Sequence, residues 1–149
     1  MKTRIVVCLF MLFGCCTKIQ AQLEKVIHQT FEIDEAVNIA LDLVGTYEIE
    51  LWAGNNILTE TKIQMFNASP AILNHFVKEK RYEIQLDANA SGIKLYSFDK
   101  ERRAIKYKEG ECAEIVNVRI FVPEDFEKID KAHLVRKAKV VKVKNNDEE

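Results

Sequence analysis

Apolar and polar residues alternate with a period of two over most of the chain beyond residue 22. The alternation is clearest over residues 37–43, 47–51, 57–65, 82–86 and 116–122. Successive side chains of a strand point to opposite faces, so this pattern predicts strands with one buried face and one face in water. A single sheet would leave its apolar face in water. We therefore expect a mainly β domain of two packed sheets around a common core.

The run 116–122 is the richest in β-branched residues and should form a central strand. Pro123 should end it, because proline cannot donate a ladder hydrogen bond. In this run Ile120 should point inward and Arg119 outward. Residues 23–33 should form a first strand, with Val26 and Phe31 available to the core. Residues 128–144 stay ambiguous between strand and helix.

Two local signals interrupt the strands. The first is Gly45-Thr46, which fits a two-residue hairpin loop with glycine in its first position. The second is Ser69-Pro70, which fits a helix N-cap followed by proline in the first turn. Apolar residues at 72, 73, 76 and 77 share one helical face, so we expect one helix near residues 69–80.

The N-terminus has the features of an export signal. Lys2 and Arg4 precede an almost wholly apolar stretch over residues 5–16, which is too short to span a bilayer. Ala21 provides a small residue for cleavage. The predicted division is a signal peptide over 1–21, a β-domain over 22–144 and a polar tail over 145–149. In the alternative, a lipobox-like motif before Cys15 would give a lipid-anchored protein.

Cleavage after Ala21 leaves Cys112 as the only cysteine, so no disulfide framework is expected within the chain. Cys112 directly follows Glu111, and a second acid stands at position 109. Neighbouring carboxylates raise the pKa of a thiol and reduce its nucleophilicity. We therefore expect a structural thiol rather than a reactive one.

Two segments resemble exported bacterial adhesin-like proteins. One is residues 47–59, where Trp52 stands two positions before Gly54, and the other is residues 116–126, where a strand ends in Val122-Pro123. The resemblance implies a β-solenoid of short strands wound into two sheets. The Gly45-Thr46 turn favours an antiparallel sandwich instead, and both architectures remain open. A family fold does not by itself define a function.

Catalytic signatures are missing from the sequence. His28, His75 and His133 are far apart and lack the spacing of metal ligands, and no phosphate loop or nucleophile elbow occurs. We expect no enzyme, no cofactor and no metal. The formal net charge of -1 also disfavours a nucleic-acid partner. No transmembrane span is expected in the mature chain.

The remaining candidates are binding surfaces. Trp52 has the outward parity of its strand, and Leu58 should lie near it across the turn, which fits an anchor for a sugar or a protein. Arg102, Arg103 and Lys106 belong to a basic cluster that suits anionic lipid or an acidic polysaccharide. We expect a non-catalytic exported envelope protein, adhesin-like or scaffolding, that binds a protein or a glycan. The alternative is a periplasmic enzyme or enzyme inhibitor.

Overall fold

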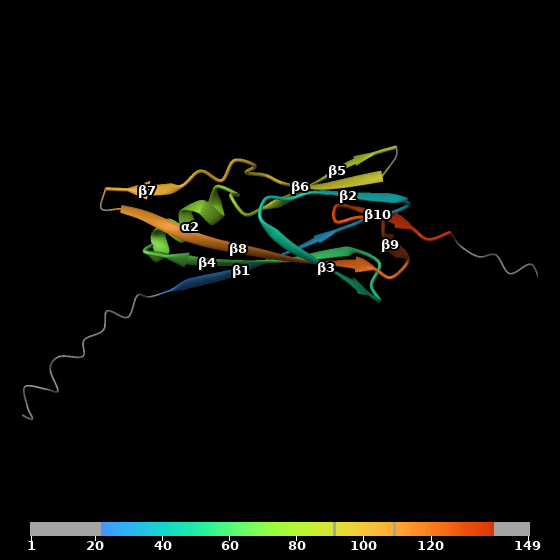
Figure 1. The fold of residues 1–149 in the computed structure, drawn as a ribbon, viewed down its shortest axis with the longest axis horizontal. Helices are drawn as coiled ribbons and strands as arrows, with labels where there is room; N and C mark the ends of the chain where they lie inside the picture. The colour runs from blue at the N-terminus through green and yellow to red at the C-terminus, as the bar shows by residue number, and fades with distance from the viewer. Residues whose placement is uncertain (1–21, 91, 109, 139–149) are drawn as a thin grey trace, which may run out of the picture.

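A computed structural model describes residues 22–138 except 91 and 109 (Figure 1). Strands account for most of this segment, together with one helix of more than one turn, α2 (Pro70–Lys78). The strands are β1 (Leu23–Phe31), β2 (Asn38–Asp42), β3 (Thr46–Trp52), β4 (Ile57–Phe66), β5 (Ile84–Asn89), β6 (Gly92–Ser97), β7 (Ile105–Tyr107), β8 (Gly110–Pro123), β9 (Phe126–Lys128) and β10 (His133–Arg136). The predicted signal peptide, its Cys15 alternative and the tail over 145–149 lie outside the described residues.

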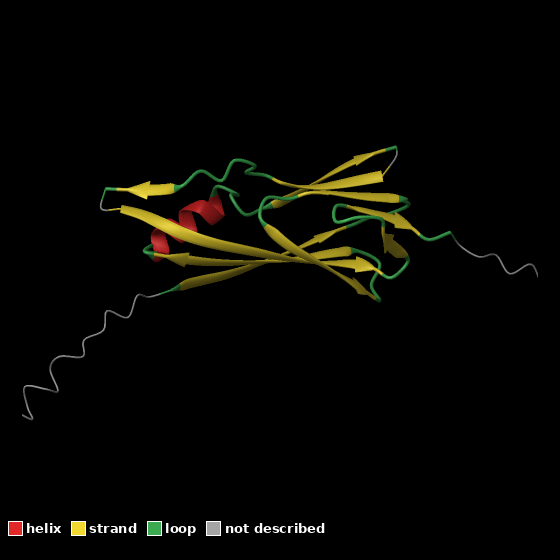
Figure 2. Cartoon of the chain, viewed as in Figure 1, coloured by secondary structure: helices red, strands yellow, loops and turns green. Residues whose placement is uncertain are grey.

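The strands form two sheets, which we call the long sheet and the short sheet. The long sheet has the order β1-β4-β8-β3, and β7 also pairs with β8. The short sheet has the order β5-β6-β2-β10-β9. In Figure 2 the two sheets lie over each other at one end of the molecule, while α2 lies beside the other end of the long strands. The predicted domain of two packed sheets and one helix is confirmed.

Strand β8 is the centre of the long sheet, as its β-branched sequence predicts. It pairs with β4 on one side and with both β3 and β7 on the other. Val118, Ile120 and Val122 are buried, whereas Arg119 is exposed, so the predicted parity is confirmed. Pro123 is the last residue of the strand.

The hairpin predicted at Gly45-Thr46 is wrong. The two flanking strands belong to different sheets, because β2 pairs with β6 and β10, whereas β3 pairs with β8. Gly45 has φ +96°, so the glycine is still needed for a left-handed backbone turn, but this turn carries the chain from one sheet to the other. Both β2–β6 and β3–β8 are parallel pairs, so neither sheet is wholly antiparallel.

Two apolar clusters make the core. The first lies between the sheets and includes Ile39, Leu95 and Ile120, and the second lies under α2 and includes Ile63 and Leu73. The helix begins as predicted, since the Ser69 hydroxyl accepts a hydrogen bond from the backbone N–H of Ile72. This cap satisfies one of the donors that the first turn of a helix leaves unpaired.

Three smaller expectations have mixed outcomes. Phe31 packs against the first cluster, but Val26 points outward and is 38% exposed. Leu51 has inward parity, yet it is 46% exposed because it lies near the open end of β3. The ambiguous stretch 128–144 supplies strand β10, and the valines at 140, 141 and 143 lie outside the described residues.

Candidate binding cleft at a sheet edge

Strand β3 has a hydrogen-bonded neighbour on one side only. It pairs with β8 over its whole length, and no other strand of the described segment pairs with it. The backbone N–H of Glu124, just after β8, donates a hydrogen bond to the carbonyl of Trp52. The backbone groups of Trp52 therefore point towards β8. In a parallel ladder alternate residues face the partner strand. The backbone N–H and C=O groups of Tyr47, Ile49 and Leu51 therefore face the free edge.

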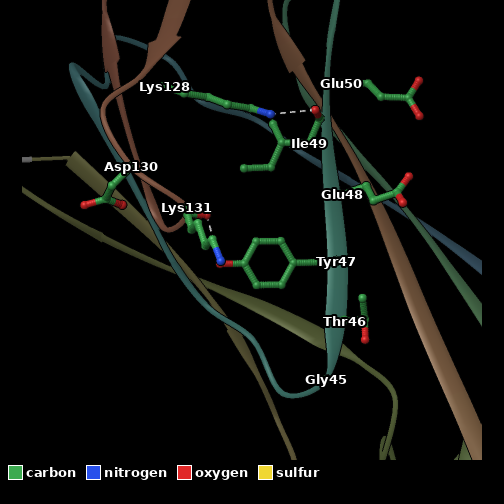
Figure 3. A pocket seen from close by; sticks show the side chains of 9 residues that line it. All are labelled: Gly45, Thr46, Tyr47, Glu48, Ile49, Glu50, Lys128, Asp130 and Lys131. Atoms are coloured by element: carbon green, nitrogen blue, oxygen red, sulfur yellow. Dashed lines mark hydrogen bonds between the residues drawn. The ribbon is translucent and has the colours of Figure 1, made fainter.

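A cleft of about 980 Å³ lies along this free edge (Figure 3). We call it the edge cleft. One wall is the backbone of residues 45–50, and the other is formed by Lys128, Asp130 and Lys131 at and after the end of β9. The inward side chains of β3, Tyr47 and Ile49, are partly buried between the walls.

Two hydrogen bonds hold the walls of the edge cleft together. The Lys128 ammonium donates to the carbonyl of Ile49 at 2.9 Å, and the Tyr47 hydroxyl donates to the carbonyl of Lys131 at 2.9 Å. The first bond covers one of the free backbone acceptors of β3. Lysine over a strand edge is a common way in which natural sheets block unwanted pairing. The side-chain cap is exposed and can move away when another donor replaces it.

Strand β5, at the edge of the short sheet, is protected differently. The Gln29 side-chain amide both donates to the carbonyl of Ile84 and accepts the N–H of Ile84, each at 2.9 Å. This pair of bonds imitates a neighbouring strand and also joins β1 to β5. The start of β5 is therefore satisfied within the chain, whereas the free edge of β3 has, among the residues that the structure describes, only the Lys128 cap.

Trp52 lies on the outward face of the long sheet, as predicted, but it packs on its own turn. Its indole N–H donates to the carbonyl of Asn56 at 3.0 Å, and its ring lies so close to Gly54 that a Cβ at that position would clash with the ring. The helix does not cover it, because α2 packs on the other cluster. Leu58 is on the same outward face, opposite Phe121 in the register of β4 and β8.

A second cleft, of about 410 Å³, lies beside Trp52. Its lining includes three exposed acids, Asp34, Glu124 and Asp125, together with Arg136. Arg136 already has partners within the chain, since its guanidinium contacts Asp125 at 3.5 Å and donates to the carbonyl of Asp34 at 3.1 Å. All three acids are exposed to solvent, and the described lining of this cleft includes no buried basic side chain.

The predicted basic residues lie far from Trp52. Lys106 is opposite Glu111 near the start of β8, whereas Trp52 is opposite Pro123 at its end. Lys106 is exposed, and Arg103 is exposed and pairs with Glu101 at 2.7 Å. The five predicted binding residues therefore do not form one site.

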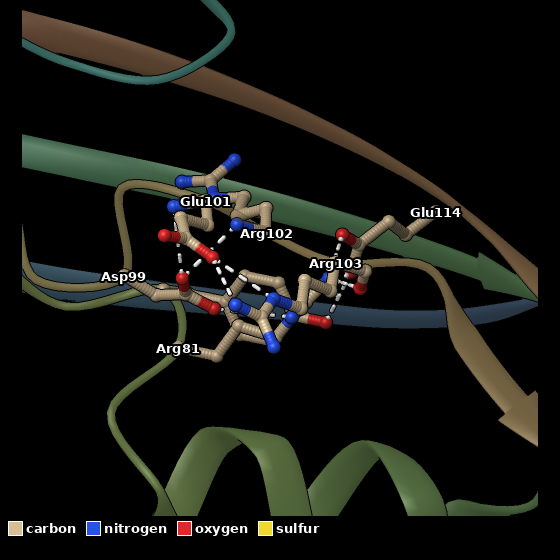
Figure 4. A network of polar contacts seen from close by, with 7 residues as sticks. Arg81, Asp99, Glu101, Arg102, Arg103 and Glu114 are labelled. Atoms are coloured by element: carbon tan, nitrogen blue, oxygen red, sulfur yellow. Dashed lines mark hydrogen bonds and ion pairs between the residues drawn. The ribbon is translucent and has the colours of Figure 1, made fainter.

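Arg102 belongs to the rim of a buried polar cluster (Figure 4). In this cluster Arg81 is 6% exposed and bonds to Glu114 at 2.7 Å and to Asp99 at 3.1 Å. The Tyr82 hydroxyl also donates to Glu114 at 2.7 Å, and burial followed by this contact raises the pKa of Tyr82. Arg102 is half-buried, lies 5.9 Å from the Tyr82 ring and has its pKa lowered by burial. This cluster joins the segment after α2 to the 98–104 segment and to β8.

Sequence reasoning did not find the edge cleft. Alternation shows that Glu48 and Glu50 point outward, but it does not show that β3 is at an edge or that Lys128 and Lys131 lie beside it. The strand order joins segments about 80 residues apart, and no local motif encodes that order. The one available signal was the like charge of Glu48 and Glu50, which is typical of strands at an edge.

Within the described segment, no group of three acidic, histidine or cysteine side chains could hold a metal ion. No helix there is long and apolar enough to cross a membrane. No family model, curated protein or solved structure matches the chain. The interpretation of the edge cleft therefore rests on its geometry.

Proposed function

We propose that the protein is a non-catalytic binding domain that takes an extended segment of a partner protein along the free edge of β3. The observation that carries the proposal is the edge cleft itself, where three residues of a seven-residue strand turn their backbone groups away from β8 and towards an open groove, and the Lys128 ammonium caps one of these groups. Addition of a strand to such an edge supplies main-chain hydrogen bonds, and pockets for alternate side chains supply specificity.

The physical support comes from what the edge lacks. An exposed strand edge is a liability that proteins usually cover, and β5 shows such a cover at Gln29. Strand β3 instead has one removable lysine cap. Exposed Leu51 lies next to the edge, where a partner side chain could cover it. A glycan at Trp52 has less support, because the turn already takes the indole N–H and one part of the ring.

The proposal extends to an exported protein of the cell envelope. Its support is the charged start, the short apolar stretch and Ala21, all read from the sequence. Intact mass of the exported protein tests this part. A chain beginning at Gln22 is expected, one beginning at an acylated Cys15 would give the lipoprotein, and one retaining Met1 would contradict export with cleavage.

Strand addition can be tested by amide hydrogen exchange. Heptapeptides selected from a displayed random library against the purified protein serve as ligands. In the free protein the amides of Tyr47, Ile49 and Leu51 should exchange quickly, and a bound peptide should slow them. The amides of Glu48 and Glu50 face β8 and should be slow in both states. A selected peptide that slows none of the three edge amides would contradict the proposal, as would a failure to select any peptide.

Two substitutions at Leu51 distinguish the contribution of the edge backbone to peptide binding from that of the side chain. Leu51→Pro removes an edge donor that faces away from β8 and has no strand partner within the described segment, and proline is tolerated at such positions. It should abolish peptide binding. Leu51→Ala keeps the N–H and should retain most of the binding. Urea unfolding of both variants confirms that they fold, and equal binding by the two would show that the edge backbone is not used.

A further inference from the structure

A row of ionisable side chains, alternately of basic and acidic type, crosses the outward face of the long sheet. His28 of β1 lies opposite Glu60 of β4, and Glu60 lies opposite Arg119 of β8. The next position in this row is Glu48 of β3, with Glu50 beside it. Side chains that are opposite each other on neighbouring strands interact directly, and opposite charges there are favourable.

The contacts follow this alternation. His28 lies 3.3 Å from Glu60, and Arg119 lies 3.4 Å from Glu60 and 2.9 Å from Glu50. Glu50 and then Glu60 raise the pKa of Arg119, because the carboxylates favour the charged guanidinium. Glu48 is exposed and makes no ion pair with any described residue. The row therefore ends at the open edge with Glu48, a carboxylate opposite Arg119 that forms no ion pair within the described segment.

A strand that adds to the free edge of β3 would occupy the next place in this row. We propose, on the basis of the strand-addition function above, that the partner segment alternates apolar residues, which enter the edge cleft, with lysine or arginine facing Glu48 and Glu50. The apolar positions follow from Tyr47 and Ile49, which point into the cleft and are partly buried. The basic positions follow from the charge row.

The same carboxylates argue against a second copy of this chain as the partner. Two β3 strands that paired antiparallel about a two-fold axis at Ile49 would place Glu48 of one copy opposite Glu50 of the other. Like charges directly opposite on neighbouring strands are destabilising. The Lys128 cap adds to this protection, because it occupies the Ile49 carbonyl until a partner donor replaces it.

The test uses three synthetic peptides, acetylated and amidated, that differ only at two positions. The basic one is Ser-Val-Lys-Val-Lys-Val-Ser, and the acidic and neutral ones carry glutamate or serine in place of both lysines. Binding to the purified protein is measured by titration calorimetry at low salt. The basic peptide should bind about tenfold more tightly than the acidic one, with the neutral peptide between them. In 1 M salt the difference should shrink severalfold.

A charge exchange on the protein sharpens the test. Glu48→Lys should reverse the order of the acidic and basic peptides. The matched control is Glu24→Lys, on the same outward face but on β1 at the far side of the sheet, and it should leave the order unchanged. Equal affinity of the three peptides would overturn the charge rule while strand addition stands. Failure of all three to bind, with no protection of the edge amides, would overturn both.

The sequence of this chain contains a stretch with part of the same pattern. Residues 139–144, outside the described segment, read Lys-Val-Val-Lys-Val-Lys, and the last four of them alternate valine with lysine. A chain that ends at Ala138 is therefore a useful second protein in the titrations. A clear gain in affinity for the basic peptide alone would identify residues 139–144 as a competitor and would support the charge rule. Equal gains for all three peptides would argue against it.

Discussion

The two halves of β8 lie against different neighbours. Over one half the short sheet covers the strand, and the inward side chains are Val118, Ile120 and Val122, all buried. Over the other half α2 and the 98–104 segment cover it, and the inward side chains include Cys112 and Glu114. The strand and its parity stay the same, but the interior changes from apolar to partly charged.

The difference follows from the size of the cover. A five-stranded sheet can bury a wide apolar face, whereas α2 has nine residues and is about 14 Å long. In this half the polar cluster of Arg81, Tyr82 and Glu114 lies beside the apolar residues under α2. The apolar half needs only suitable volume and pattern. The charged half needs particular partners, because a buried charge without its partner is costly.

The largest effect should come from a charge placed in the apolar half. Ile120→Asp puts a carboxylate at a position with 0% exposure in the first apolar cluster, where the hydroxyl of Thr59, opposite it on β4, cannot neutralise the charge. It should cost at least about 4 kcal/mol of the free energy of unfolding and prevent folding. Circular dichroism and urea unfolding measure this.

The matched control changes the neighbouring residue on the outward face. Arg119→Asp loses the contacts with Glu50 and Glu60, which are exposed to solvent, so its effect on stability should be far smaller. If the two substitutions had equal effects, the parity assigned to β8 would be wrong. A mainly helical circular dichroism spectrum of the unmodified protein would contradict the fold itself.

The next effect should come from breaking the polar cluster in the other half. Glu114→Leu leaves the buried Arg81 guanidinium with Asp99 as its carboxylate partner and the carbonyl of Arg103 as a neutral acceptor, and it removes the acceptor of the Tyr82 hydroxyl. We expect a loss of about 3 kcal/mol in urea unfolding. Glu111→Leu, on the exposed face of the same strand, should change stability by less than about 0.5 kcal/mol. Similar losses in both variants would mean that the cluster adds nothing specific.

The sequence predicts the apolar half well and the charged half poorly, for a physical reason. Alternation over 116–122 identifies a strand and its buried face. The apolar side chains of such a strand share the face that is buried, and the polar side chains share the face in water. Glu114 occupies an inward position of the same strand but carries a charge. The alternation rule therefore does not predict that this residue is buried. Its burial depends on Arg81 and Tyr82, more than 30 residues away, and no local pattern encodes that contact.

The same limit applies to the candidate site. The parity of the strand predicts that Trp52 lies on the outward face, and it does. Its hydrogen bond to Asn56, however, depends on the conformation of the turn that follows. The edge cleft depends on strand order. The Gly45 turn shows this clearly, since its glycine conformation was readable from the sequence but its destination in the other sheet was not.

A smaller effect is expected at Cys112, which packs in the second cluster and donates to the carbonyl of Asn67 at 3.2 Å. Cys112→Ser keeps a donor but loses apolar volume, so it should cost about 1 kcal/mol. Burial, with Glu111 and Glu114, raises the pKa of the thiol. Alkylation at pH 8 should therefore be at least about tenfold slower in native than in urea-unfolded protein. Equal rates would show that the half under α2 is open to solvent.

The smallest effect concerns Asp42, whose carboxylate joins β2 to Lys100 at 2.7 Å and to Lys94 at 2.8 Å. Lys100 belongs to the segment that leads from the short sheet to the half under α2. These bonds, with Lys100 first, lower the pKa of Asp42 to about 2 from 3.8. A folded-state pKa below the unfolded value means that the stabilisation is present above about pH 4 and is lost as pH falls towards 2.

Asp42→Asn should therefore lower stability at pH 6 by less than about 1 kcal/mol, because the pairs are nearly half exposed to solvent. The difference from the unmodified protein should shrink between pH 4 and pH 2 and also in 0.5 M salt. Asp87→Asn is the control, since Asp87 is exposed on β5 of the same sheet and makes no ion pair with any described residue. Urea midpoints at pH 6, 4 and 3 give the comparison. A difference that stays constant with pH would show that Asp42 acts through its shape, and the electrostatic link between the two halves would then be absent.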